Sequence, residues 1–341
     1  MDDSRLNLGI IGSGFIARTH AHSITTPLHH ARLTGIAGGS RASDVANEFS
    51  IRCFRDPIEL VTNNDVDAVI IATPHHLHKD HAILAAEHGK HVLVEKPMAL
   101  SVRDCISIIE ACRNNEVKLM VAFTQRYRMT NRMAYDIIRS GRIGNVIMIQ
   151  EQALIPNGSS AFPKWQQSKE NLGILFGYGI HNIDKLRWIL QDEPSSVSAQ
   201  LNRNDNGIET STMATIRWRN GVMSNLWSSV DMIPPGFPNS SFRSLVVGEK
   251  GLLDVDGYGE LRILENSQNW KTLCIQPPID WRGNGMFSAE RLGSFSMQNQ
   301  QFIDSIINDS EPPVTGYDGM RAVAIALDIY KAADTNTTIS Y

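Results

Sequence analysis

Short apolar segments alternate with helical segments over the first third of the chain, and this alternation limits the possible folds more than any other feature. Five segments have the length and composition of buried strands: 6–11, 33–37, 67–72, 91–94 and 118–123. Helical stretches are expected between them at 43–49, 77–88 and 101–114. In the last of these, Ser101 is expected to cap the helix, with Asp104 three residues later. Apolar strands separated by helices predict βαβ units and a parallel sheet.

The rest of the chain has the pattern of a different sheet. A strand is expected at 146–155, and two alternating runs, 212–218 and 222–227, flank the tripeptide Arg219-Asn220-Gly221. Asn-Gly between alternating runs is a strong hairpin signal. Further short strands are expected at 245–247, 252–255 and 261–264. The sequence therefore predicts a mostly antiparallel second sheet, packed on helices near residues 182–190.

Length, charge and cysteine usage exclude several classes of protein. A chain of 341 residues predicts two domains. The net charge is -4 and no Lys/Arg run occurs, so a nucleic-acid partner is not expected. No segment approaches the ~20 apolar residues of a membrane span, and the acidic N-terminus is unlike a signal peptide. The four cysteines form no C-x-x-C pair and are read as reduced thiols, so we expect a cytoplasmic protein.

A glycine-rich loop follows the first expected strand. Residues 12–17, with the sequence GSGFIA, fit the pattern G-x-G-x-x-G/A of dinucleotide-binding loops. Gly12 permits a tight turn, Gly14 lets the backbone approach a pyrophosphate, and Phe15 and Ile16 open a helix whose N–H groups attract an anion. A plain strand–turn–helix without a ligand is the alternative.

The end of the second strand bears on the choice of dinucleotide. An NAD site usually has an acidic residue there, but the sequence reads Gly38-Gly39-Ser40-Arg41 and the first carboxylate is Asp44. Ser40 and Arg41 can instead receive the 2′-phosphate of NADP, which slightly favours NADP over NAD. The alternative is that Arg41 is simply a solvated helix residue.

The tripeptide Glu95-Lys96-Pro97 follows the fourth strand directly. Ligands of open α/β sheets bind outside the carboxyl ends of the strands, so Glu95 and Lys96 are expected beside the cofactor. Burial or a nearby positive charge there lowers the pKa of a lysine and lets it act as a base. The alternative is a surface lysine before a proline.

The histidines at 75–81 are close enough in sequence to suggest a metal site. Thr73, Pro74 and His78 follow the third strand and are expected at the cofactor, but the cluster at 75–81 has no H-E-x-x-H pattern, so no metal is predicted. The other histidines of the first domain are expected on the surface or on helix faces: His20, His22, His29 and His30.

Together, the glycine-rich loop, Thr73-Pro74 and Glu95-Lys96-Pro97 resemble the Gfo/Idh/MocA family of oxidoreductases. Four further segments agree with this resemblance, in the same order: 123–127 (FTQRY), 141–144 (GRIG), 179–184 (GIHNID) and 313–330. The resemblance covers essentially the whole chain.

The resemblance implies a fold and an activity. It implies an α/β protein with an N-terminal Rossmann domain at 1–123 and a C-terminal domain at 124–341, which has a mostly antiparallel open sheet and a closing helix at about 319–333. It also implies a homo-oligomer, a dimer or tetramer, formed through that sheet. The implied activity is NAD(P)-dependent oxidation or reduction of a sugar, cyclitol or related polyol.

The resemblance also assigns roles to residues. Lys96 matches the catalytic lysine and His181 the histidine that binds or relays protons at the reacting hydroxyl. Substrate contacts are expected further from Gln125, Arg126, Trp165, Tyr178 and Asp184. For Trp165 a buried packing role is an equal alternative to a substrate contact.

One position departs from the family pattern. Many members carry an aspartate four residues before the histidine, where this chain has Gly177. Two alternatives follow: a dehydrogenase of a less hydroxylated ring such as a cyclic dihydrodiol, and a non-catalytic NAD(P)-binding sensor. Retention of Lys96 and His181 argues against the sensor, which needs neither group.

Overall fold

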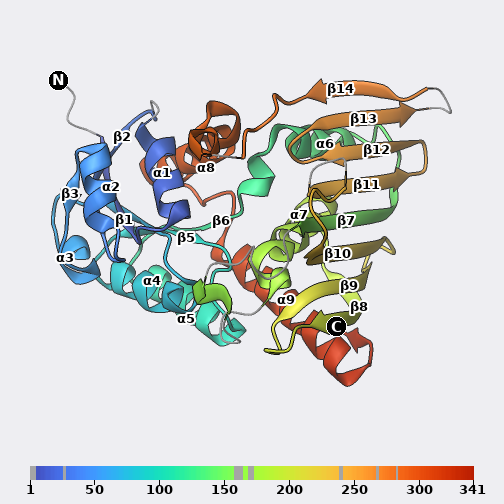
Figure 1. Ribbon diagram of the computed structural model, residues 1–341, viewed down its shortest axis with the longest axis horizontal. Helices are drawn as coiled ribbons and strands as arrows, with labels where there is room; N and C mark the ends of the chain where they lie inside the picture. The colour runs from blue at the N-terminus through green and yellow to red at the C-terminus, as the bar shows by residue number, and fades with distance from the viewer. Residues whose placement is uncertain are drawn as a thin grey trace. The chain divides into compact units, whose positions relative to one another are not determined.

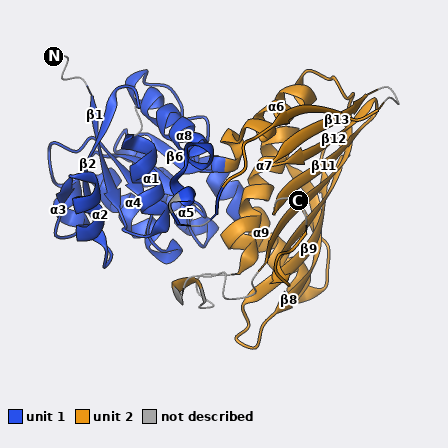
Figure 2. Cartoon of the chain, turned by 45° about the horizontal axis from the view of Figure 1, so that its top comes forward, with its two compact units in different colours: residues 1–124, 280–323 blue, residues 125–279, 324–341 orange. Residues whose placement is uncertain are grey.

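The computed structural model divides into two compact units (Figure 2). Unit 1 comprises Met1–Thr124 and Asp280–Val323, and unit 2 comprises Gln125–Ile279 and Ala324–Tyr341. The structure describes residues 5–25, 28–156, 164–167, 173–237, 241–265, 269–281 and 283–341. No helix among these residues is long and apolar enough to cross a membrane.

Unit 1 is built on a six-stranded sheet in the order β3-β2-β1-β4-β5-β6, and all its strands are parallel. The strands are β1 (Leu6–Ile11), β2 (Ala31–Ala37), β3 (Arg52–Cys53), β4 (Ala68–Ile71), β5 (His91–Glu95) and β6 (Leu119–Ala122). All four residues of β4 are buried, as a strand covered on both faces requires. The predicted Rossmann-like α/β class is therefore confirmed; the two-residue β3 was not expected.

Several helices of unit 1 begin within one residue of their expected starts, whereas those at 57–61 and 289–307 were not expected. They are α1 (Phe15–Thr25), α2 (Ala42–Phe49), α3 (Pro57–Val61), α4 (His78–Glu87), α5 (Val102–Asn114), α8 (Ala289–Ile307) and the first part of α9 (Gly316–Thr335). Ser101 caps α5 as predicted, because its Oγ accepts the N–H of Asp104 at 3.1 Å.

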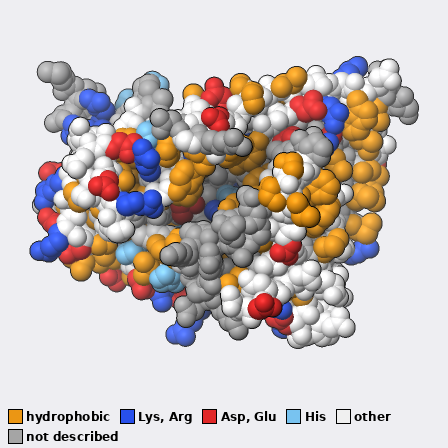
Figure 3. All heavy atoms as spheres, in the orientation of Figure 1, with side chains coloured by type: hydrophobic (Ala, Val, Ile, Leu, Met, Phe, Trp, Pro, Cys, Tyr) orange, Lys and Arg blue, Asp and Glu red, His pale blue; other side chains and the backbone are white. Residues whose placement is uncertain are grey.

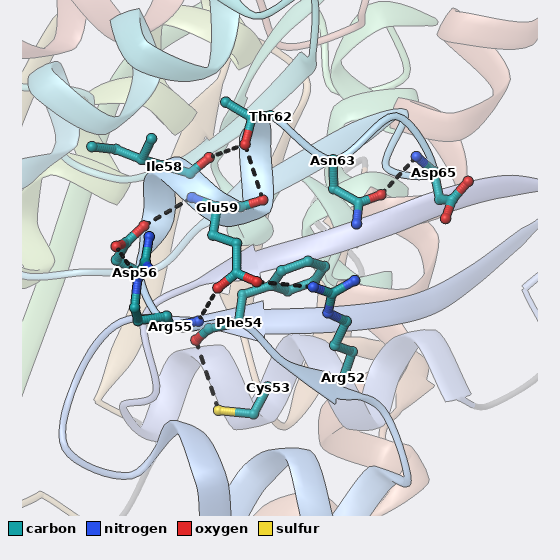
Figure 4. A network of polar contacts seen from close by, with 10 residues as sticks. All are labelled: Arg52, Cys53, Phe54, Arg55, Asp56, Ile58, Glu59, Thr62, Asn63 and Asp65. Carbon is teal, nitrogen blue, oxygen red and sulfur yellow. Dashed lines mark hydrogen bonds and ion pairs between the residues drawn. The ribbon is translucent and has the colours of Figure 1, made fainter.

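At the start of α3 the helix N-terminus is capped by two side chains, Asp56 and Glu59 (Figure 4). Asp56 accepts the N–H of Glu59 at 2.8 Å, and the Glu59 carboxylate reaches back to the N–H of Arg55 at 2.7 Å. Pro57 occupies the first helical position, where a missing N–H costs nothing. The hydrogen bond from Glu59 is the main reason that the pKa of Asp56 lies below its usual value.

Residues 280–323 depart from the expected domain limits. The sequence placed all of 124–341 in the second domain, whereas this segment packs in unit 1. Asn299 of α8 donates to Ser23 of α1 at 2.8 Å, and the N–H of Val121 in β6 donates to the carbonyl of Val314 at 3.1 Å. The chain thus returns to the first unit, where α8 packs against α1.

Unit 2 contains a nine-stranded sheet in the order β14-β13-β12-β11-β7-β10-β9-β8-β15. The first five strands in the chain are β7 (Val146–Pro156), β8 (Pro194–Arg203), β9 (Glu209–Trp218), β10 (Met223–Met232) and β11 (Phe242–Gly248). The remaining four are β12 (Gly251–Asp256), β13 (Glu260–Glu265), β14 (Lys271–Ile275) and β15 (Ile339–Ser340). Only β7 and β10 pair in parallel among the described strands of this sheet. The predicted mostly antiparallel sheet is confirmed.

The hairpin predicted around Asn220-Gly221 joins β9 and β10. Trp218 donates its N–H to the carbonyl of Val222 at 2.9 Å, and Gly221 adopts a φ of +89° that favours glycine. Along β9 the burial alternates, with Ala214, Ile216 and Trp218 inside and Met213 exposed. One face of the sheet is therefore buried.

Helices cover that buried face (Figures 1 and 2). They are α6 (Met129–Arg139), α7 (Ile180–Leu190) and the last part of α9. α6 contacts β12 and β13, and α7 contacts β7. α7 is preceded by a π-helical turn, Leu175–Gly179, which carries Gly177 and Tyr178.

Candidate functional site

The glycine-rich loop of unit 1 has the backbone that its sequence predicts. Gly12 has a φ of +115°, and a Cβ at this position would lie 2.4 Å from the carbonyl oxygen of Ala72, so only glycine fits. At Gly14 the space is open: no described atom lies within 4 Å of the point where a Cβ would stand. A ligand can therefore approach the backbone of Gly14 without hindrance.

The first turn of α1 faces the same loop. The first helical hydrogen bond of this turn runs from the N–H of Arg18 to the carbonyl of Gly14 at 3.1 Å. The N–H groups before Arg18, which include those of Phe15 and Ile16, have no acceptor within the helix. Free N–H groups and the positive end of the helix dipole suit a phosphate group, so these residues fit a dinucleotide.

The loop after β2 lies against the glycine-rich loop. Arg41 donates its backbone N–H to Ser13 Oγ at 3.2 Å, and a Cβ on Gly39 would stand 2.3 Å from the same oxygen. The side chains of Ser40 and Arg41 are exposed. No carboxylate stands between the end of β2 and Asp44, which is in the first turn of α2.

Lys96 comes directly after the last residue of β5, at the carboxyl edge of the parallel sheet. Its side chain is half-buried, and desolvation lowers the pKa of its amine below the usual 10.5. The carboxylate of Glu95 opposes this shift. Glu95 also accepts the backbone N–H of Lys96 at 3.1 Å, and the Lys96–Pro97 peptide bond is cis.

His78, the first residue of α4, is fully buried and contacts backbone on two sides. Its Nδ1 lies 2.8 Å from the carbonyl oxygen of Pro97 and its Nε2 lies 2.9 Å from that of Thr73. Burial lowers the pKa of His78, and the hydrogen bonds to the carbonyls of Pro97 and Thr73 oppose this shift. These contacts give His78 a role in holding the loops that follow β4 and β5; a direct cofactor contact from His78, Thr73 or Pro74 stays a prediction.

His20 corrects an expectation from the sequence. It was expected on a surface or helix face, but its ring has no exposed surface, and its Nε2 lies 3.0 Å from Oε1 of the buried Glu95. Phe295 of α8 packs edge-on against the ring at 5.5 Å. This pair could not be predicted from local sequence patterns, because its partners lie 75 residues apart.

In unit 2, His181 lies in the first turn of α7 and is buried, with 7% of its surface exposed. Gly177 lies in the π-helical turn four residues before it, and its N–H donates to the carbonyl of Gly173 at 3.0 Å. Tyr178 is half-buried, and its ring packs 6.3 Å from that of Phe242. The segment that joins Gly177 to His181 is thus helical throughout.

Two residues predicted to contact substrate are paired with each other. Arg126 donates to Asp184 through Nε at 2.8 Å and through Nη2 at 2.5 Å. The Asp184 side chain has no exposed surface and that of Arg126 has 8%. This pairing holds the Asp184 carboxylate in the interior of unit 2. Substrate contacts from Arg126 and Asp184 stay predictions.

Gln125 and Trp165 complete the predicted set. Gln125 is buried, donates to the Tyr258 hydroxyl at 3.0 Å and accepts from Asn131 at 3.1 Å, so its amide serves the interior of unit 2. Trp165 is half-buried in a 3₁₀ turn, Lys164–Gln167. Substrate contacts from Gln125 and Trp165 remain predictions.

Unit 2 also contains two buried polar clusters that the sequence did not reveal. Lys185 of α7 lies 2.9 Å from Glu151 of β7 and donates to Ser244 of β11 at 2.7 Å. In the second cluster, Glu209 accepts the N–H of Leu175 at 3.0 Å, the hydroxyl of Tyr330 at 3.1 Å and the hydroxyl of Thr212. Both clusters fix the helical segment that carries His181.

The described residues contain no group of three or more His, Cys, Asp or Glu side chains that could hold a metal ion. In the cluster at 75–81, His81 instead lies 3.2 Å from the Thr73 hydroxyl.

A parallel sheet with an anion-binding glycine loop at its carboxyl edge, joined to a second unit with an open sheet, defines a two-domain dinucleotide-binding protein. Two family models match in the order of these units. Residues 6–123 match the oxidoreductase family with an NAD-binding Rossmann fold, and residues 131–254 match the GFO/IDH/MocA C-terminal domain. The chain belongs to the Gfo/Idh/MocA family of oxidoreductases.

Individual relatives span nearly the same length. Inositol 2-dehydrogenase of Salmonella typhimurium is 24% identical over 344 residues, which cover 98% of this chain and 96% of that protein. The 1,5-anhydro-D-fructose reductase of Ensifer adhaerens is 27% identical over 282 residues, covering 81% and 80%. The crystal structure of scyllo-inositol dehydrogenase from Lactobacillus casei with NAD(H) and scyllo-inositol has a TM-score of 0.81 and 23% identity, covering 98% and 99%. This last likeness shows the shared fold.

Proposed function

We propose that this protein is an NAD(P)-dependent dehydrogenase or reductase that acts on a ring hydroxyl or carbonyl of a sugar, cyclitol or related polyol. The observation that carries the proposal is the position of Lys96. It is a lysine of lowered pKa at the carboxyl edge of the same parallel sheet as the open glycine loop. The inositol dehydrogenase and anhydrofructose reductase among its relatives support the substrate class.

Oxidation of a secondary alcohol removes a hydride from carbon and a proton from oxygen. A bound nicotinamide dinucleotide supplies the hydride acceptor. The neutral amine of Lys96 takes the hydroxyl proton, and burial assists this role by raising the neutral fraction of the amine at a given pH. His181 is proposed to hydrogen-bond the substrate oxygen or an adjacent hydroxyl. Reduction of a carbonyl is the reverse of these steps.

The Lys96→Met variant tests the proposal. Loss of a general base typically costs 10²–10⁴-fold in rate, so turnover should fall by about 10³-fold. Reduced nicotinamide is followed by absorbance with inositol, glucose and a cyclic dihydrodiol, each with NAD and with NADP. Calorimetry should show unchanged cofactor affinity, and Lys250→Met, at an exposed lysine of unit 2, is the control. Wild-type turnover in Lys96→Met would show that another group is the base.

The cofactor is proposed to be NADP at least as readily as NAD. The end of β2 offers the exposed Ser40 and Arg41 and no carboxylate before Asp44. A 2′-phosphate prefers a guanidinium, whereas free ribose hydroxyls prefer a carboxylate. The matching family model describes an NAD-binding Rossmann fold, which supports a nicotinamide dinucleotide as the cofactor and does not distinguish NADP from NAD.

Gly177 supports a substrate that is bulkier or less hydroxylated than inositol. Glycine at this position supplies neither the charge nor the volume of the family's usual aspartate, and its place in the helical turn before His181 puts the difference near that histidine. Gly177→Asp should reduce activity on the true substrate and raise it on simple polyols. Equal gains on a polyol and on a cyclic dihydrodiol would instead show a site that has merely lost its carboxylate.

The outer face of the unit 2 sheet is proposed to form a homo-oligomer, a dimer or tetramer. Large apolar side chains are exposed on its strands: Met148, Met213, Met223 and Leu245. Hydrophobic side chains gather over this sheet in the space-filling view (Figure 3). Such a patch commonly marks an interface. Light scattering at low micromolar concentration should give a multiple of 37.9 kDa, and Met213→Glu should shift it toward the monomer.

A further inference from the structure

Lys96 is held through the backbone on both of its sides. On one side its own N–H donates to Glu95 Oε2 at 3.1 Å, and Glu95 Oε1 lies 3.0 Å from His20 Nε2. On the other side the carbonyl oxygen of Pro97 lies 2.8 Å from His78 Nδ1. Both imidazoles are fully buried. Neither of these contacts involves the Lys96 side chain. Both instead restrain the backbone on either side of Lys96, which sets the direction of its side chain.

The two histidines come from different helices of unit 1. His20 lies on α1, which begins at the glycine-rich loop, and His78 opens α4 and also lies 2.9 Å from the carbonyl oxygen of Thr73, after β4. The turn after β5 is thus tied to α1 and to the loop that follows β4. A buried hydrogen bond to a carboxylate is among the stronger polar contacts in proteins, and its loss leaves a buried acceptor without a partner.

We propose that His20 and His78 are positioning residues, which hold the Glu95-Lys96-Pro97 turn so that the amine of Lys96 meets its substrate. The catalytic part of this inference rests on the proposed function of Lys96. The geometric part, that the two imidazoles immobilise the turn, stands independently of any reaction.

The two contacts can be separated with amide side chains. The amide nitrogen of glutamine occupies about the place of a histidine Nε2, and that of asparagine about the place of Nδ1. At position 20 the contact is made by Nε2, so His20→Gln keeps a donor to Glu95 and His20→Asn does not. At position 78 the contact to Pro97 is made by Nδ1, so His78→Asn keeps it and His78→Gln keeps only the contact to Thr73.

The expected result is a crossed pattern. A misplacement of about 1 Å at a reacting group costs about 10²-fold, so kcat should fall about 10- to 100-fold in His20→Asn and His78→Gln. In His20→Gln and His78→Asn the contact is kept, and the position of the Lys96 amine is kept with it. The kcat of these two variants should therefore stay within about 3-fold of wild type. KM and cofactor affinity should change little in all four. His88→Gln, at an exposed histidine that caps the end of α4, is the control.

A second measurement does not depend on turnover. The N–H of Lys96 is itself bonded to Glu95, so its hydrogen exchange reports the state of the turn. Exchange should quicken at least about 10-fold in His20→Asn and His78→Gln and stay near wild type in the two conservative variants. Glu95→Gln should move the acidic limb of the pH–rate profile to lower pH, because Glu95 raises the pKa of Lys96. The groups that face this amine include Glu95 and His78.

These readouts separate the two possible failures. If wild type shows no turnover but the exchange pattern is crossed, the proposed function fails and the positioning role of the histidines stands. If asparagine and glutamine act alike at each position, in rate and in exchange, the proposal is overturned. If all four variants exchange like wild type, the histidines do not hold the turn, and the proposal is likewise overturned.

Discussion

The two units differ in how most of the residues expected to meet a ligand are held, although unit 1 also contains one buried long-range pair, His20 with Glu95. In unit 1 the groups expected to meet a ligand follow the ends of strands and come from short motifs, such as the glycine loop and Glu95-Lys96-Pro97. In unit 2 the polar groups are buried and paired over long stretches of chain. Arg126 and Asp184 are 58 residues apart, and Glu209 and Tyr330 are 121 apart. The comparison shows why motifs reveal the chemistry of unit 1 and only hint at that of unit 2.

This difference has a consequence for mutations. A side chain at a strand end can be changed at little cost to stability, since it is partly solvated and makes few contacts. A member of a buried ion pair cannot, because its partner is left charged in a low-dielectric interior. Substitutions of the exposed strand-end residues of unit 1 should therefore lower activity first, and those of the buried pairs of unit 2 should lower the free energy of unfolding first.

The largest effect is expected at the Arg126–Asp184 pair. Asp184→Asn removes the countercharge of a guanidinium whose side chain is 8% exposed, which should cost about 3–5 kcal/mol of unfolding free energy. Denaturation followed by tryptophan fluorescence reports mainly on unit 2, which contains five of the six tryptophans, all but Trp281. An unchanged unfolding free energy in Asp184→Asn would show that water reaches the pair, and it would weaken the contrast between the two units.

The same unit offers a matched control. Arg142 and Glu265 form an ion pair of similar fork-like geometry, with both N–O distances at 2.7 Å, but on the surface. Because exposed ion pairs are worth little, Glu265→Gln should leave the unfolding free energy almost unchanged. Equal effects of Asp184→Asn and Glu265→Gln would mean that burial is not what distinguishes the two pairs.

A somewhat smaller effect, which depends on pH, is expected at Glu209. Burial raises the pKa of this carboxyl from 4.5 to about 7. Between these values the folded protein keeps a proton that the unfolded chain has lost, so stability is greatest below pH 4.5 and falls as the pH rises through 7. From about pH 5 to about pH 8 the loss should be about 2–3 kcal/mol.

The Glu209→Gln variant isolates this contribution. Glutamine keeps an acceptor for the N–H of Leu175 and cannot ionise. The difference in unfolding free energy between variant and wild type should therefore grow with pH over that window. A difference that is independent of pH would show that the pKa of Glu209 is the same in the folded and unfolded states, because its hydrogen bonds and the charge of Arg203 offset the effect of burial.

The sequence predicted the fold where its signals are local. The strand before Gly12, the hairpin at Asn220-Gly221 and the cap at Ser101 each depend on a few neighbouring residues, and the structure has all three. α8 was missed because the polar residues Ser294, Gln298 and Asn299 interrupt the buried face that Leu292, Phe295, Phe302 and Ile303 form.

The candidate site divides in the same way. The glycine loop and Lys96 lie where their motifs placed them on the sheet. The partner of His20 and the pairing of Asp184 depend on which distant elements pack together, and hydrophobic periodicity contains no such information. Asp184 lies on the expected helix, α7, and its contact with substrate stays a prediction.

A smaller effect, on binding alone, is expected at Arg41 in unit 1. Loss of a charge-assisted hydrogen bond costs about 1.5–3 kcal/mol, so Arg41→Ala should weaken NADP binding by about 10- to 100-fold. NAD affinity and thermal stability should stay unchanged, since the side chain is exposed. Calorimetric titration measures both affinities. Strong preference of the wild type for NAD would refute the NADP assignment and leave Arg41 as a solvated residue.

The smallest effect is expected at Ser101, where unit 1 depends on a purely local contact. Its Oγ accepts the N–H of Asp104 at 3.1 Å and donates to the Asp104 carboxylate at 2.8 Å. Ser101→Ala removes the cap and should destabilise α5 by about 1 kcal/mol. Since a two-domain chain need not unfold in one step, hydrogen exchange of the α5 amides is the suitable measurement. Ser107→Ala in the same helix is the control, because Ser107 only donates to the carbonyl of Arg103 and alanine is a better helix former. A loss at Ser101 as large as that at Asp184 would mean that the local signals of unit 1 bear on stability as strongly as the buried pairs of unit 2.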